Sequence, residues 1–205
     1  MSHVLYRRSY PGPVYIHYGA DHFDPELFKE IKNRPNWVKP ESHTGLWASP
    51  RNSERSWKAW VEAEHYGSDL TKSFEFRMSD PGKVFYIFDA PSYEVFVKLY
   101  GIKNPFGSLE YNIYVPDFEK MVADGWDGLE ISISSWPKLY DLFYGWDCDS
   151  ILVFNKEAIE ELSKEEQKDE EVRLSIFEEF DARRDTMGDD VFVWWDTELH
   201  HNFES

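Results

Sequence analysis

Cysteine is almost absent from this sequence of 205 residues, and no long apolar run interrupts it. A single cysteine, Cys148, cannot form a disulfide within the chain, and it excludes a cysteine-based zinc site. We interpret its side chain as packing rather than as a reactive thiol. Without a membrane-length apolar stretch or a leader-like N-terminus, the sequence predicts a soluble, cytoplasmic protein, long enough for one well-buried domain.

The sequence also lacks the short motifs of several large enzyme classes. It contains no phosphate-binding P-loop, no Gly-x-Ser-x-Gly elbow and no His-Glu-x-x-His pair. Near the C-terminus, His200 and His201 stand close to Asp196 and Glu198. Histidines in such an acidic tail are more often solvated surface than metal ligands, so we assign no metal.

Basic residues are scarce, because 22 Lys and Arg stand against 39 Asp and Glu, for a formal net charge of −17. This charge argues against broad, non-specific binding to nucleic acid or to anionic membranes. It is uneven: residues 1–60 carry nine basic and six acidic side chains, whereas residues 156–205 carry six against seventeen. The N-terminal part is compatible with a phosphate-bearing ligand, and the C-terminal part is typical of an acidic attachment, unless the acidity serves solubility alone.

Period-two and β-rich patterns predict six short strands and three helices, without a regular alternation of the two. The class expected is therefore α+β. The predicted strands are 14–19, 45–49, 73–78, 83–88, 128–133 and 150–155. The predicted helices are 53–66, capped by Asn52 or Ser53, then 92–100 after Pro91 and 117–125 after Pro116.

Two further segments carry distinct patterns. Residues 21–43 combine a short helical piece, 24–32, with a proline-punctuated stretch, which is typical of a functional loop. We divide the chain into a main domain, 1–155, and an acidic helical extension, 156–205, docked on it. A possible last strand is 191–195. The apolar stripe expected to dock the extension consists of Ile159, Leu162, Val172, Ile176, Phe177 and Phe180.

Aromatic residues make up 18% of the chain, with nine Trp, so large rings are expected to line a pocket as well as a core. Four short pieces stand out by their order along the chain: HYG at 17–19, TGLWAS at 44–49, DGLEISI at 127–133 and CDSILVFNKEAI at 148–159. Their order resembles the ADP-ribosyltransferase fold of the diphtheria-toxin and poly(ADP-ribose) polymerase type. That resemblance implies a split β-sheet core with short helices, and NAD as the substrate.

The resemblance also implies roles for single residues. His17 hydrogen-bonds the adenosine-side ribose, and the backbone beside Gly19 approaches the nicotinamide amide, which a residue without a Cβ permits. Tyr18 and Ser49 complete the expected NAD site. Trp47 stands where such proteins usually carry a tyrosine, and its ring can stack on nicotinamide. Taken alone, His17 is more typical of a core histidine bonded to a backbone carbonyl, and Trp47 of a core ring of the sheet.

Glu130 is the expected catalytic residue. Breaking the bond between nicotinamide and ribose builds positive charge on the anomeric carbon, which a nearby ionised carboxylate stabilises. On a strand, Glu130 points to the face opposite Leu129 and Ile131. The alternative is a solvent-facing strand glutamate. Gly128 stands where enzymes that modify arginine commonly carry Glu or Gln, which disfavours arginine as the acceptor.

The predicted function is therefore mono-ADP-ribosylation of a macromolecule, protein or nucleic acid, in a toxin, a phage effector or an anti-phage component. A nucleic-acid acceptor would have to meet the basic N-terminal part. One alternative is an acidic interaction or inhibitor protein without catalysis, such as a nucleic-acid mimic, with a partner bound through the extension; another is an NAD glycohydrolase. The candidate phosphate contacts are Arg7, Arg8, Arg51, Arg55 and Lys58.

Overall fold

The computed structural model describes residues 6–8, 12–108, 111–173 and 175. The chain divides into two compact units, Met1–Leu162 and Ser163–Ser205. The described part of the second unit is helical over 164–173, and Val172 on this helix is exposed. Every strand of the described chain belongs to the first unit.

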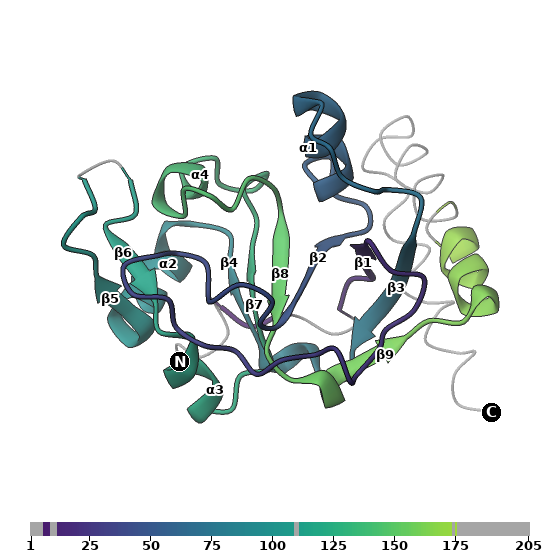
Figure 1. The fold of residues 1–205 in the computed structure, drawn as a ribbon, viewed down its shortest axis with the longest axis horizontal. Helices are drawn as coiled ribbons and strands as arrows, with labels where there is room; N and C mark the ends of the chain where they lie inside the picture. The colour runs from purple at the N-terminus through teal and green to yellow at the C-terminus, as the bar shows by residue number, and fades with distance from the viewer. Residues whose placement is uncertain (1–5, 9–11, 109–110, 174, 176–205) are drawn as a thin grey trace, which may run out of the picture. The chain divides into compact units, whose positions relative to one another are not determined.

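Seven strands of the first unit form one sheet, in the order β4-β7-β8-β2-β1-β3-β9 (Figure 1). The pair β4–β7 is parallel, and the other neighbours are antiparallel. The α+β class and the six predicted strands are thereby confirmed. The strands are β1 Tyr15–Tyr18, β2 Leu46–Pro50, β3 Ser73–Met78, β4 Val84–Ile87, β7 Gly128–Ile131, β8 Ser150–Val153 and β9 Ile159–Glu161.

Helices begin where a short polar side chain can accept a hydrogen bond from the first turn. Helix α1 (Trp57–Glu64) starts after Ser56, α2 (Ala90–Tyr100) after Asp89 and α3 (Phe118–Ala123) after Asp117. Each of these three side chains accepts from a backbone N–H three residues further on. The remaining helical elements are α4 Leu139–Leu142 and the 3-10 turns η1 Pro81–Lys83 and η2 Lys156–Ala158.

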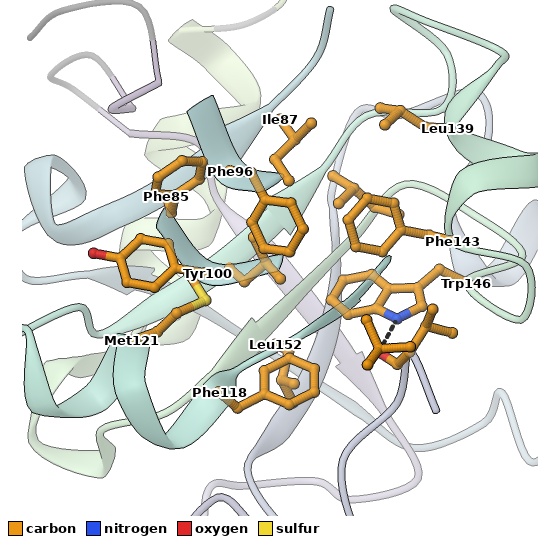
Figure 2. Packing of buried hydrophobic residues seen from close by; sticks show 14 of the residues in the cluster. Phe85, Ile87, Phe96, Tyr100, Phe118, Met121, Leu139, Phe143, Trp146 and Leu152 are labelled. Atoms are coloured by element: carbon orange, nitrogen blue, oxygen red, sulfur yellow. Dashed lines mark hydrogen bonds between the residues drawn. The ribbon is translucent and has the colours of Figure 1, made fainter. Parts of the chain in front are cut away.

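The two faces of the sheet bury different cores, because successive side chains of a strand point to opposite sides. Leu129 and Leu152 pack with α2, α3 and the segment around Trp146 in a large aromatic cluster, part of which Figure 2 shows. Ile151 and Val153 point to the other face. There they join Tyr15, Ala48, Phe74, Phe76, Met78, Val84 and Ala158.

A hydrogen bond across the sheet shows that it is curled. Tyr15 lies on β1 and Glu130 on β7, with β2 and β8 between them. Neighbouring strands are about 4.8 Å apart, so a flat sheet would separate these two strands by about 14 Å. Nevertheless the Tyr15 hydroxyl donates to Glu130 Oε2 over 2.6 Å. The second core and Glu130 therefore lie on the concave face.

The sequence prediction was wrong for the helix at 24–32. Only a turn occurs there, at residues 25–27. Backbone groups that a helix would use are paired elsewhere, because Gly45 N donates to Lys29 O and Glu41 N donates to Lys32 O, each over 2.9 Å. The cap of α1 is also different. Ser53 Oγ donates to Asp149 Oδ2 over 2.7 Å, and Ser56 caps the helix instead.

Residues 156–162 were predicted as the start of a helical extension, and this too was wrong. They form η2 and then β9, which pairs with β3 and continues the main sheet. Strands β5 (Gly101–Lys103) and β6 (Tyr114–Pro116) were not predicted, and they form a separate two-stranded sheet.

Several predicted features lie outside the described residues. They are the apolar positions Ile176, Phe177 and Phe180, the strand at 191–195, and the polar group around His200. Among the helices that the structure does describe, none is long and apolar enough to cross a membrane.

Candidate functional site

A cavity of about 320 Å³ lies beside β1 and β2 in the first unit. Four of the residues predicted to bind NAD line it, namely His17, Tyr18, Trp47 and Ser49. They come from two segments that are adjacent in the sheet but 30 residues apart in the chain, counted from His17 to Trp47. The four residues that the motif resemblance assigns to an NAD site therefore lie around one cavity.

The cavity opens where the backbone pairing of β1 with β2 stops. The two strands are paired at Tyr15–Pro50 and Ile16–Ser49, and the ladder does not continue to His17. Beyond that point the imidazole of His17 bonds to β2 in place of the backbone: its Nδ1 lies 2.7 Å from the carbonyl oxygen of Trp47. One side chain thus occupies the position of a ladder bond, and the strands separate around it.

The hydrogen bond to Trp47 fixes the protonation of His17. A carbonyl oxygen only accepts, so Nδ1 carries the proton and donates it. Burial lowers the pKa of His17 below its ordinary value of 6.5, while the bond to the Trp47 carbonyl opposes this shift. The ring is therefore neutral at pH 7, and Nε2 has a free lone pair. Such a nitrogen accepts a hydrogen bond from a ligand hydroxyl.

Tryptophan rings form much of the cavity wall. Trp47 is half-buried and meets Trp146 edge to face, with ring centroids 4.5 Å apart. Trp57, the first residue of α1, stacks on Trp60 at 5.1 Å. Rings held by such contacts present fixed flat surfaces, which suit a planar heterocycle. Tyr18 completes this wall, and burial, followed by the charges of Glu62 and Glu75, raises the pKa of its hydroxyl.

Ser49 and Gly19 shape the chain around the cavity in different ways. Ser49 is completely buried, and its Oγ accepts a hydrogen bond from Trp57 N over 2.8 Å. It therefore positions the start of α1. Gly19 does not line the cavity in the described structure, but its φ of 107° lies where residues with a Cβ are disfavoured. Its N–H donates to Lys72 O over 2.9 Å, one residue beyond the last pair of β1 with β3.

Lys39 and Asp147 supply opposite charges at the cavity. Their closest charged atoms, Nζ and Oδ2, are 3.9 Å apart, and the side chains are 45% and 24% exposed. Among the described residues that line the cavity, these are the only Lys, Arg, Asp or Glu. Asp149 lies close by in sequence but is buried, and it accepts hydrogen bonds from Ser53, from Ser134 N and from the Ser134 hydroxyl.

Glu130 lies away from this cavity, in the concave face of the sheet. It was expected to act as the catalytic residue of the NAD site, but β8 separates its strand, β7, from β2. Its side chain is fully buried rather than solvent-facing. It accepts hydrogen bonds from Arg8 Nε over 2.8 Å, from the second Arg8 nitrogen over 2.5 Å and from the Tyr15 hydroxyl. Glu130 does not line the cavity, so its predicted catalytic role gains no support from the geometry.

The pKa shifts around Glu130 follow from its charge. Burial by itself disfavours the charged Arg8 guanidinium, but the paired hydrogen bonds and the charge of Glu130 outweigh it and raise the pKa of Arg8. Burial, reinforced by the Glu130 charge, raises the pKa of Tyr15 well above 10. The Arg8 guanidinium also lies 3.8 Å from the centre of the Tyr86 ring. We term Arg8, Tyr15, Tyr86 and Glu130 the buried ionic cluster.

The five predicted phosphate contacts have different surroundings. Arg8 is bound to Glu130, and Arg51 donates to Glu75 over 3.0 Å, so both are already paired with acids. Arg7 donates to the Gly82 carbonyl and lies over the Trp126 ring. Arg55 and Lys58 are exposed near the start of α1. None of the five lines the cavity described above.

Sequence reasoning missed Lys39, Trp57 and Asp147. Lys39 lies in the proline-punctuated loop that was expected to be functional, although the residue itself was not singled out. Asp147 stands three residues before β8 and one residue before the piece 148–159 on which the sequence analysis drew. Its relevance depends on β8 pairing with β2, since the pairing of Trp47 with Leu152 and of Ala48 with Ile151 brings the start of β8 toward Ser49.

Comparisons of this chain with protein-family models, with curated proteins and with solved structures find no match.

Proposed function

We propose that the protein binds NAD in this cavity and transfers ADP-ribose from it to a macromolecule. The observation that carries the proposal is the convergence of His17, Tyr18, Trp47 and Ser49 on one wall. The motif resemblance assigns these same four residues to an NAD site. Their meeting at a cavity is what a shared ligand requires.

The surroundings of these residues fit the parts of a dinucleotide. Nε2 of neutral His17 accepts a hydrogen bond from a ribose hydroxyl, and the tryptophan wall offers faces for the positively charged nicotinamide ring. Lys39 offers a cation for the pyrophosphate. A volume of about 320 Å³ is near the lower end for small-molecule sites, so part of the dinucleotide lies over the rim.

Transfer breaks the bond between the ribose anomeric carbon and the nicotinamide nitrogen, which keeps the electron pair and leaves as neutral nicotinamide. The acceptor atom bonds to the same carbon and loses its proton. The positive charge that builds on the ribose calls for an ionised carboxylate beside it. In our proposal Asp147 has this role, since it is the cavity's carboxylate among the described residues. Glu130 has three hydrogen bonds within the fold and serves structure.

The proposal is tested by adding NAD to the purified full chain. We expect calorimetric binding that weakens on the order of tenfold in Trp47→Ala, because a stacked aromatic contact is lost. Leu99→Ala, an exposed apolar residue on α2, is the matched control and keeps the parental affinity. NAD labelled on the adenine ring then reports the acceptor in a cell extract.

Label in protein or in nucleic acid supports the transferase. Free ADP-ribose without labelled macromolecule replaces the transferase with an NAD glycohydrolase. Absence of NAD binding by the parent overturns the proposal and favours the acidic interaction protein.

A further inference from the structure

A second hollow of the first unit, with a volume of about 730 Å³, adjoins the candidate NAD cavity. Its aromatic walls are Trp37, Phe106, Tyr111 and Tyr144, and we term it the aromatic groove. These four side chains are from 43% to 83% exposed. They come from three places in the chain: the loop before β2, the connection between β5 and β6, and the segment after α4.

The groove and the cavity share two stretches of chain. Trp37 lines the groove and Lys39 lines the cavity, two residues further on. In the same way Tyr144 lines the groove, whereas Gly145, Trp146 and Asp147 line the cavity. The two stretches are joined where Trp146 Nε1 donates to Val38 O over 3.0 Å, and Figure 2 shows the Trp146 ring with its hydrogen bond. A molecule in the groove therefore lies next to the wall that carries Asp147.

The groove combines exposed rings with primary amides. Asn36, Asn104 and Asn112 line it, and Asn112 Nδ2 donates to Tyr144 O over 3.2 Å. The other amide atom, Asn112 Oδ1, is buried without a hydrogen-bond partner among the described residues. No Asp, Glu, Lys, Arg or His lines the described part of the groove.

We propose that the aromatic groove binds an extended segment of a protein, which is the acceptor of ADP-ribose. The inference rests on the proposed function for its link to NAD. Exposed Trp and Tyr, with Arg34 4.3 Å from the centre of the Trp37 ring, are residue types enriched at protein interfaces. An extended peptide presents backbone N–H and C=O groups, which the exposed side-chain amide of Asn36 can bind.

Charge separates a protein from a nucleic acid as the occupant. Single-stranded nucleic acids are bound in positively charged grooves, where stacking adds to phosphate contacts. Here the chain carries a net charge of −17, and Arg8 and Arg51, two of its candidate phosphate contacts, are paired with acids. An uncharged or basic peptide segment meets no such opposition.

The first experiment needs no NAD and uses the full chain. Fluorescein-labelled synthetic decapeptides from a random-sequence library are first selected for binding to the parent. Fluorescence anisotropy then measures their affinities for the double variant Trp37→Ala with Phe106→Ala, and for the control Leu27→Ala. Leu27 is 75% exposed, similar to Phe106 at 83%, and it does not line the described groove. We expect the double variant to bind selected peptides more weakly, by on the order of tenfold or more, and the control to match the parent. Labelled oligodeoxythymidine is the nucleic-acid probe.

Peptides that bind the parent and the double variant equally would overturn the groove as a peptide site. Binding of the oligonucleotide that is lost in the double variant would overturn the protein assignment. The second experiment adds labelled NAD and extract to the same variants. We expect the double variant to bind NAD as the parent does but to label protein at least about tenfold more slowly. A parent that binds peptides in the groove but does not bind NAD would refute the proposed function and the acceptor role, and leave the groove as an interaction site.

Discussion

Two carboxylates of the first unit, Glu130 and Asp147, have opposite surroundings. Glu130 on β7 is fully buried and accepts three hydrogen bonds from Arg8 and Tyr15. Asp147, close to the start of β8, is partly exposed in a cavity, and its nearest cation is 3.9 Å away. A carboxylate whose lone pairs are already used stabilises the fold, whereas one with free lone pairs beside a cavity is available to a ligand.

The comparison also explains why the N-terminal segment is tied to the sheet. Arg8 inserts its guanidinium between Glu130 and the Tyr86 ring, and Tyr15 closes the other side of the carboxylate. Each member satisfies another in a region from which water is largely excluded. Such a cluster is sensitive to the loss of one partner, because the remaining charge stays buried. The cavity residues have fewer mutual bonds, and substitutions there should change ligand binding more than stability.

The largest effect on stability is expected for Glu130→Gln. The neutral amide keeps the shape of the side chain but leaves the Arg8 guanidinium without its counter-charge, so the free energy of unfolding should fall by about 3–5 kcal/mol. Urea unfolding followed by circular dichroism measures it. The matched control is Glu94→Gln, an exposed residue on α2, with an expected change within about 0.5 kcal/mol. Equal stability of both variants would show that the cluster does not hold the fold.

A smaller loss is expected for Tyr15→Phe. The ring keeps its stacking on Phe76, at 5.5 Å, but the hydrogen bond to Glu130 disappears. Because that bond has a charged acceptor, its removal should cost about 1.5–3 kcal/mol in the same urea measurement. Tyr18→Phe is the control, since the Tyr18 hydroxyl has no side-chain hydrogen bond in the described structure. The idea fails if the two substitutions have the same cost.

Ser49→Ala probes the wall of the cavity rather than the buried ionic cluster. It leaves the N–H of Trp57 without the Ser49 Oγ acceptor, at an expected cost of about 1 kcal/mol. Ser79→Ala keeps the backbone bond from Ser79 N to Ala158 O and should change stability little. Should Ser49→Ala also be neutral, the start of α1 is held by other contacts.

The smallest effect concerns the pH dependence of His17. Its pKa is lowered in the folded protein, so the unfolded chain binds a proton more readily. The stabilising contribution is fully present above pH 6.5, decreases as the pH falls below that value, and is lost below the folded pKa. Stability of the parent relative to His17→Asn should therefore decline on acidification. A proton NMR titration of the His17 ring checks the shift directly, and a pKa at or above 6.5 would contradict it.

Local patterns predicted the strands well but could not predict their order. Period-two and β-rich runs identified β1, β2, β7 and β8, of which β7 and β8 are buried throughout and β1 and β2 only in part. Whether β7 or β8 lies beside β2 depends on pairings distant in sequence, and this decided that Asp147 rather than Glu130 reaches the cavity. Local patterns could not place His17 beside Trp47 either; that expectation came from the motif resemblance alone.

The remaining misses have local physical causes. Strand β9 is short, and its acidic residues are typical of the exposed face of a helix. In the structure Glu161 accepts a hydrogen bond from Phe23 N and lies against His22. The segment 24–32 has helical spacing, but tertiary backbone bonds to residues 41–45 replace those of a helix. Propensity is a weak signal wherever distant partners satisfy the backbone.

The most direct test of the central claim compares nicotinamide release from NAD by the parent, Asp147→Asn and Asp124→Asn. Asp124 is a surface carboxylate paired with Lys120, as Asp147 faces Lys39, and it lies outside the described cavity. We predict that Asp147→Asn lowers the rate by on the order of 10²–10³ while its calorimetric affinity for NAD changes little, and that Asp124→Asn matches the parent. The assignment of the catalytic carboxylate would be contradicted if Asp147→Asn released nicotinamide at the parental rate. It would also be contradicted if Glu130→Gln, still folded and still binding NAD, lost as much of the release rate.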